Sequence, residues 1–396
     1  MLTKGFQQIA LSVSFASGLV AATAWAAGPE DQHPFDIEAP PLADRVHGLS
    51  TIWSEAKFSF AYFDQVPDLD WDEAYRASIP RVVAAETLYE YYRELQAFVA
   101  LLEDGHTNVR MPSAIKTDVV PLTLEPIEDR YFVANAATML ADEVPIGSEI
   151  VSVRGIDTQE YVQTEVQPYI AQSAPHTRAY WSGILLLRAP VGEEVAFEIM
   201  TPAGERREII APTGHFYSRH EYVPPHPKHE LGLTWPAEGI AKVIVPTFYG
   251  NSLPADFAEL IPELEHADAI ILDFRFNGGG VTSNAHALLR HLTDRPLQGP
   301  RWVTREHRAA HRVWGAHGTA HLAQYGQLDA WTEPESMQEV RIARAGALAG
   351  KPIAVLTSSH TASTAEDFLI YADPLENVTR IGRPTCGSTG QPFSFD

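Results

Sequence analysis

The sequence has little of what disulfide-bonded, nucleic-acid-binding and membrane-spanning proteins need. Cys386 is the only cysteine among 396 residues, which excludes an intramolecular disulfide and a cysteine-based zinc site. Asp and Glu outnumber Lys and Arg by 51 to 29, and the net charge of −22 argues against nucleic acid and anionic lipid as partners. No apolar run reaches the length of a bilayer span. We therefore expect a globular protein that is held together by its cores.

The N-terminal segment has the pattern of an export signal. Lys4 supplies a basic start, residues 9–22 are largely apolar, and Ala24-Trp25-Ala26 fits the small-x-small cleavage rule. We predict a signal peptide over residues 1–26 and an exported protein, periplasmic or extracellular, with no stable membrane insertion after cleavage. An uncleaved membrane anchor is the alternative.

Hydrophobic periodicity divides the remaining chain into three segments. Spacing by three and four predicts a helical bundle over residues 38–115, and a period of two predicts a small β domain over residues 116–213. Strands alternate with helices over residues 230–396, which predicts an α/β layer with mostly parallel strands. Residues 300–346 have weak periodicity and are predicted to form an inserted lid.

One glycine-rich stretch could expose backbone donors at a strand end. In DFRFNGGG, residues 273–280, three consecutive glycines follow a strand, and such a loop can form an oxyanion hole or an anion nest. A tight turn between strand and helix is the simpler interpretation. The pattern is neither G-x-G-x-x-G nor a P-loop, so no dinucleotide site is predicted.

Two further stretches hold a candidate nucleophile and a candidate base. In SSHTASTAEDFL, Ser363 and Glu366 have the spacing of a capping box directly after a buried strand. The positive end of that helix would stabilise an oxyanion next to Ser363, so one serine can be both cap and nucleophile. In LLEDGHTNV, His106 follows an Asp-Gly turn and is the candidate general base.

Taken in this order, the three stretches resemble peptidase family S41, the C-terminal processing and tricorn-like serine proteases. DFRFNGGG is similar to the family's D-x-R-x-N-x-G-G loop, ASTAE to its nucleophile motif, and DGHT to its histidine motif. IGRPTCGSTGQ is similar to the strand and loop that follow the nucleophile. VPIGSEIVSVRGI and APVGEEVAFEIMTPAGE resemble a PDZ-like module between the motifs.

The resemblance implies a multidomain α/β protein with a helical bundle, a PDZ-like β domain and a ClpP/crotonase-like catalytic core. It implies Ser363 as nucleophile and His106 as base, with no metal or organic cofactor. The oxyanion hole would consist of the Thr364 N–H and a glycine N–H, from Gly278 or, in preference, Gly279.

The missing lysine favours the tricorn-like branch of the family, which uses a histidine as base. The processing branch carries a lysine 25 residues after the serine, where this chain has Ser388, and no lysine follows Lys351. Two features depart from the tricorn-like pattern. Gly105 stands where that branch has a serine, and the sequence ends at Asp396, before the expected acidic residue. We therefore expect the sequence to be truncated at its C-terminus.

Other arrangements of residues are weighed against this site. His360 lies three residues before Ser363, although neighbours at a strand end usually point apart. The histidine pairs His307/His311 and His317/His321, with Glu55 and Glu306, could offer metal ligands, but the zinc-protease motif is absent.

The sequence thus predicts an exported serine-type peptidase that acts on peptides or unfolded protein. A non-catalytic peptide-binding protein and a carboxylic-ester hydrolase are the alternatives. Nothing in the sequence indicates an oligomeric state.

Overall fold

The structure is a computed structural model that describes residues 35–214, 221–225, 230–336, 346–390 and 392–395. The predicted signal peptide, residues 1–26, lies outside the described residues. Within the described ranges, no helix is both long and apolar enough to cross a bilayer.

Three helices form the first part of the described chain. They are α1 (Leu42–Ser59), α2 (Trp71–Ala84) and α3 (Leu88–Ala100). Asp70 caps α2 by accepting the N–H of Glu73 at 2.9 Å, as its place before the apolar repeat predicts. The rings of Trp71 and Phe98 stack at 4.1 Å in a core shared by the three helices.

A seven-stranded sheet with helices between its strands follows. Its members are β2 (Leu122–Ile127), β3 (Arg130–Ala137), β4 (Glu149–Val153), β5 (Ile156–Asp157), β7 (Glu194–Met200), β8 (Arg206–Pro212) and β9 (Tyr222–Val223). The paired strands are antiparallel, and their buried and exposed residues alternate, as the period of two predicts.

Several elements of this part were not predicted from the sequence. The strands β1 (Thr117–Val119) and β6 (Arg188–Pro190) form a separate antiparallel pair. Helices α4 (Thr158–Tyr161) and α5 (Pro175–Leu185) lie between β5 and β6, with a π-helical turn over Val162–Val166 and a 3-10 turn over Gln167–Tyr169. Short apolar runs do not distinguish helix from strand, so periodicity alone missed them.

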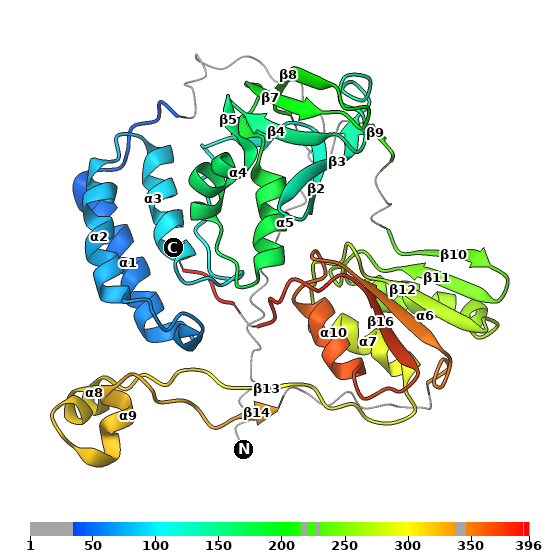
Figure 1. Cartoon of the computed structure of the whole chain (residues 1–396). Helices are drawn as coiled ribbons and strands as arrows, with labels where there is room; N and C mark the ends of the chain where they lie inside the picture. Colours follow the sequence, from blue (N-terminus) through cyan, green and yellow to red (C-terminus); the bar gives the residue numbers. More distant parts are fainter. Residues whose placement is uncertain (1–34, 215–220, 226–229, 337–345, 391, 396) are drawn as a thin grey trace, which may run out of the picture. The chain divides into compact units, whose positions relative to one another are not determined.

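The last part is an α/β layer with a five-stranded sheet (Figure 1). The strand order is β10 (Gly232–Ala237), β11 (Ile240–Ile244), β12 (Ala269–Asp273), β15 (Ile353–Thr357) and β16 (Val378–Gly382). Helices α6 (Leu253–Leu264), α7 (Thr282–Leu292) and α10 (Thr364–Ala372) complete it, and α7 packs beside α10. All pairs except β10–β11 are parallel, so the predicted mostly parallel layer is confirmed.

The insertion between β12 and β15 contains its own short elements. They are β13 (Arg301–Trp302), α8 (Ala309–Ala316), α9 (Ala323–Gly326) and β14 (Glu335–Ser336). The ring of His307 lies 4.5 Å from that of Phe58 on α1, between ring centroids. The insertion therefore contacts the helical part of the chain; its role as a lid stays a prediction.

Parallel pairing determines where the candidate motifs meet. Strands β12 and β15 are neighbours and run in the same direction, so their carboxyl ends share one edge of the sheet. The glycine loop follows β12 and the Ser363 loop follows β15. Their proximity is thus a direct result of strand order.

Candidate active site

Ser363 occupies a strained turn at the start of α10. Its backbone has φ +53° and ψ −122°, a conformation that L-residues rarely adopt and that commonly marks functional turns. Its N–H donates to Glu366 Oε2 and to the carbonyl oxygen of Ser388, each at 3.0 Å. The Glu366 N–H donates to the Ser363 carbonyl at 2.8 Å. These bonds hold a non-glycine residue in a left-handed conformation.

The glycine loop is held against Ser363 by Asn277, which is fully buried. The Asn277 side chain donates to the Val245 carbonyl at 2.9 Å and accepts the Gly279 N–H at 3.0 Å. Its main-chain carbonyl accepts the Ala362 N–H at 3.1 Å. One buried residue therefore connects the segment after β11, the glycine loop and the serine loop.

Gly279 approaches the serine loop too closely for any side chain. A Cβ at this position would lie 2.8 Å from both the Ala362 carbonyl oxygen and the Ser363 Cβ, and 3.0 Å from the Thr364 nitrogen. Its φ of +96° independently favours glycine. The glycine requirement in the motif thus has two separate physical causes.

Two backbone donors remain beside Ser363. The N–H groups of Gly278 and Thr364 make no hydrogen bond within the described part of the chain, whereas the Gly279 N–H is taken by Asn277. The Thr364 hydroxyl donates to the Gly280 carbonyl at 2.8 Å, which fixes the start of α10 to the glycine loop. These two N–H groups, one in the glycine loop and one at the start of α10, are the candidate donors of an oxyanion hole.

Asp273, the first residue of the glycine motif, forms two ion pairs at the end of β12. It is buried and pairs with Lys242 at 2.9 Å and Arg275 at 2.7 Å. Burial alone would raise the pKa of Asp273, but hydrogen bonds from Arg275 and Lys242 outweigh it and lower the pKa. Asp273 is therefore a charged anchor for the loop and has no contact with Ser363 among those observed.

His106 lies in a tight turn after α3 and contacts the segment that follows β16. The Thr107 hydroxyl closes this turn by donating to Asp104 Oδ2 at 2.5 Å. The His106 ring bonds through Nδ1 to the hydroxyl oxygen of Ser388, 2.8 Å away. A Cβ on Gly105 would lie only 3.0 Å from that same Ser388 oxygen. Ser388 thus fills the space that a side chain at position 105 would need.

Glu366 anchors the segment that carries Ser388. Its carboxylate is buried and accepts the N–H groups of Gly387 at 2.7 Å and Ser388 at 2.9 Å, in addition to that of Ser363. From the other side, Thr177 at the start of α5 donates to the Cys386 carbonyl at 2.9 Å. Burial raises the pKa of the Cys386 thiol to about 11, so this cysteine is a poor nucleophile.

The structure thus brings Ser363, Thr364, Gly278 and Gly279 together and connects His106 to them through Ser388. Within the described residues, no hydrogen bond joins the Ser363 hydroxyl to the His106 ring directly. His360 bonds through Nδ1 to the Tyr180 hydroxyl at 3.0 Å, and its Nε2 faces Gly278.

The histidine pairs considered as metal ligands have other contacts. The ring of His307 lies against Phe58, and that of His311 against Tyr325. Glu306 accepts hydrogen bonds from Arg308 and Tyr325. The described ranges contain no group of three or more His, Cys, Asp or Glu side chains placed to hold a metal ion.

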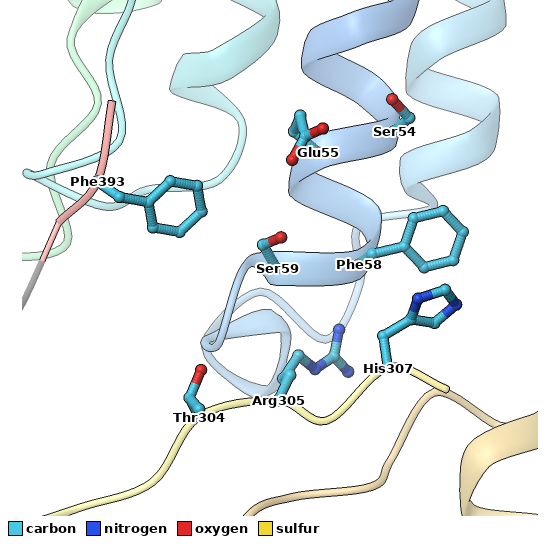
Figure 2. Close-up of a pocket in the computed structure, with 8 residues that line it drawn as sticks. All are labelled: Ser54, Glu55, Phe58, Ser59, Thr304, Arg305, His307 and Phe393. Carbon is cyan, nitrogen blue, oxygen red and sulfur yellow. The ribbon is translucent and has the colours of Figure 1, made fainter. Parts of the chain in front are cut away.

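Figure 2 shows the residues that line a cavity of about 490 Å³. It is lined by residues of α1, of the insertion and of the C-terminal segment: Ser54, Glu55, Phe58, Ser59, Thr304, Arg305, His307 and Phe393. None of the residues predicted for catalysis or the oxyanion hole lines it, although Glu55 and His307, which were weighed as metal ligands, do. We therefore do not identify this cavity as the active site.

Sequence reasoning missed three residues that organise the site. Asn277 belongs to the glycine motif, but its role in joining two loops depends on neighbours far along the chain. Ser388 was noted only as the position without a lysine. Gln172, whose side-chain oxygen lies against Gly105, is buried and carried no signal in the sequence.

Comparisons with known proteins place this geometry in a family. A solved structure of mature CPAF in complex with lactacystin aligns with a TM-score of 0.68 and 16% identity, covering 88% of this chain and 86% of that one. Mature CPAF alone aligns with a TM-score of 0.67 at 16% identity, covering 88% and 85%. The photosystem II D1 C-terminal processing protease aligns at 14% identity with a TM-score of 0.45, covering 87% and 82%.

The CPAF structures show that the fold is shared, with helices at the N-terminal end and several sheets. Residues 239–396, which contain the glycine loop, Ser363 and Ser388, match the family model of peptidase family S41. The resemblance predicted from the motifs is therefore confirmed over this part of the chain, which is similar to peptidase family S41.

Proposed function

We propose that this chain is a serine-type peptidase that hydrolyses peptide bonds through an acyl-enzyme at Ser363. One observation carries the proposal: Ser388 bonds His106 through its hydroxyl and the Ser363 N–H through its carbonyl. The candidate base and the candidate nucleophile are thus held by a single residue. The family of residues 239–396 supports a peptidase in general.

In the first step, the Ser363 hydroxyl oxygen attacks the carbonyl carbon of the substrate. His106 Nε2 takes the hydroxyl proton, which requires the ring to come within hydrogen-bond reach of Ser363. In the tautomer with its hydrogen on Nδ1, the ring donates to the Ser388 hydroxyl and Nε2 is free to accept the proton, so the contact with Ser388 is compatible with His106 as the base.

The negative charge on the carbonyl oxygen is stabilised by backbone donors. We assign this role to the N–H groups of Thr364 and Gly278, since neither has another partner within the described residues. Gly279, the glycine preferred from the motif, contributes the close approach of the two loops while its N–H bonds Asn277.

The second half of the reaction restores the enzyme. The protonated His106 gives its proton to the leaving amine as the carbon–nitrogen bond breaks, which produces the acyl-enzyme. Water then attacks the ester carbon, loses a proton to His106, and Ser363 leaves with that proton as its hydroxyl. No step needs a metal or an organic cofactor.

The sequence patterns extend the proposal to the whole chain. We propose a helical bundle over residues 38–115, a PDZ-like domain over 116–213, and a ClpP/crotonase-like core over 230–396 with a lid at 300–346. We also propose export directed by residues 1–26, the tricorn-like branch of the family, and peptides or unfolded protein as substrates.

Labelling with a fluorophosphonate probe tests the nucleophile. The protein, Ser363→Ala and the control Ser283→Ala, which changes an exposed serine on α7, would be labelled side by side. We expect Ser363→Ala alone to lose both the labelling and the hydrolysis of unfolded casein. Absence of labelling in all three folded proteins would leave a non-catalytic peptide-binding protein. Labelling with turnover of p-nitrophenyl acetate but not casein would indicate an ester hydrolase.

A further inference from the structure

A small cavity remote from Ser363 concentrates positive charge. It has a volume of about 100 Å³ and is lined by three arginines, Arg93 of α3, Arg154 of the turn between β4 and β5, and Arg188 of β6. The only acidic side chain in its lining is that of Glu165. The lining thus carries two more positive charges than negative ones.

Arg188 is the innermost of these cations and has no carboxylate partner in the described ranges. It is half-buried, and its Nε donates to the Thr117 hydroxyl at 2.8 Å. Burial is the largest influence and lowers the pKa of Arg188; the charge of Arg93 lowers it further, whereas Tyr89 and the charge of Asp118, which forms no ion pair with Arg188 among the described residues, act in the opposite direction. A buried cation without an ion pair is costly, and an anion in the cavity would offset that cost.

Arg154 and Arg93 differ in what they already do. Arg93 donates to the Glu165 carbonyl at 2.9 Å and stacks on the Tyr169 ring, so it has a structural role in joining α3 to the turn at 162–169. The Arg154 guanidinium is exposed and makes no hydrogen bond or ion pair within the described residues. The observed contacts therefore give Arg93 a structural role and give Arg154 none.

We propose that this cavity is a binding site for an oxyanion group, a carboxylate or a phosphate carried by a small ligand, held between Arg154 and Arg188. Guanidinium groups match these anions because their planar N–H donors form paired, charge-assisted hydrogen bonds. The volume admits such a group but no folded partner. The negative charge of the exposed Glu165 carboxylate repels the anion and lowers its affinity for the cavity. This site is independent of the function proposed for Ser363.

Calorimetric titration of the full chain with inorganic phosphate, and separately with acetate, tests the proposal at constant ionic strength. We expect saturable binding with one site per chain. Arg154→Met should weaken binding about tenfold, because one charge-assisted contact is lost. Glu165→Gln should tighten it, because the repulsion is removed. Arg207→Met, on strand β8 outside the cavity, should bind as the unmodified protein does.

The two ligands separate the possible sources of the anion. Tighter binding of phosphate supports a phosphorylated ligand, and tighter binding of acetate supports a carboxylate ligand. Arg188→Met adds a second test if it folds, since Arg154→Met and Glu165→Gln change only exposed side chains. The proposal is overturned if no saturable heat appears up to about 10 mM of either anion, or if Arg154→Met and Glu165→Gln bind both anions as the unmodified protein does.

Discussion

Ser388 Oγ lies 2.8 Å from His106 Nδ1, and the carbonyl oxygen of the same serine accepts the Ser363 N–H at 3.0 Å. Residue 388 thus couples two residues that are far apart in the sequence. Because the ring nitrogen that faces Ser388 cannot also face a substrate, this contact orients the other nitrogen for chemistry.

Replacing Ser388 by Ala should lower kcat about 10- to 100-fold, because His106 loses the hydrogen bond that orients its ring. KM should change little, since Ser388 is a positioning residue and is not expected to touch the substrate. The measurement is kcat and KM for a fluorogenic peptide across pH 5–9. Replacement by Thr, which keeps a hydroxyl, should recover part of the rate. Equal kcat values for the Ala variant and the unmodified protein would remove this role from Ser388.

Positions 105 and 388 should show coupled effects, because a Cβ at 105 would lie 3.0 Å from Ser388 Oγ and 2.8 Å from the Gln172 side-chain oxygen. Gly105→Ser alone should lower stability by about 1–3 kcal/mol through overpacking. In a Ser388→Gly background the same change should cost less. Urea unfolding of the two single variants and the double variant gives the coupling energy. Strictly additive effects would show that the two positions do not compete for space.

Two glycines with nearly the same φ angle provide a matched test of the close approach at Gly279. Gly250 has φ +97°, and a Cβ added there would have no neighbour within 4 Å. Gly279 has φ +96°, but a Cβ added there would lie within 3.0 Å of the serine loop. Gly250→Ala should therefore cost about 1 kcal/mol from backbone strain alone. Gly279→Ala should cost about 3 kcal/mol and abolish turnover, because overpacking adds to the same strain. Similar losses of stability and activity in both variants would contradict this difference.

Asp367 should make the protein less stable as the pH rises from about 4 to about 6. Burial, assisted by the charge of Glu366, raises the pKa of Asp367 from 3.8 to about 6. Between these values the unfolded chain loses the proton while the folded chain keeps it, so the free energy of unfolding falls with increasing pH. The loss is complete above pH 6 and amounts to at most about 3 kcal/mol.

Asp367→Asn should remove this pH dependence and stabilise the protein at pH 7 and above. Urea unfolding between pH 4.5 and 8 measures the difference between the variant and the unmodified protein. Asp294→Asn, which changes an exposed carboxylate, serves as the control. If the free-energy difference between Asp367→Asn and the unmodified protein stays constant over this range, Asp367 does not titrate as predicted.

The sequence by itself determined the elements that local patterns encode. Asp70 and the capping spacing of Ser363 and Glu366 marked helix starts that the structure contains, and the Ile- and Val-rich runs marked the parallel strands. The order of the motifs identified the family, which the match over residues 239–396 confirms. These features were readable because caps, periodicity and motif spacing act within a few residues of one another.

Only the tertiary structure decided which residues meet. Strand order places the glycine loop beside Ser363, Asn277 fastens the two loops, and Ser388 reaches His106 across 282 positions of sequence. It also explains Gly105, which departs from the tricorn-like pattern, since Ser388 occupies the adjoining space. Such contacts arise from packing between distant segments, and periodicity and local propensity carry no information about them.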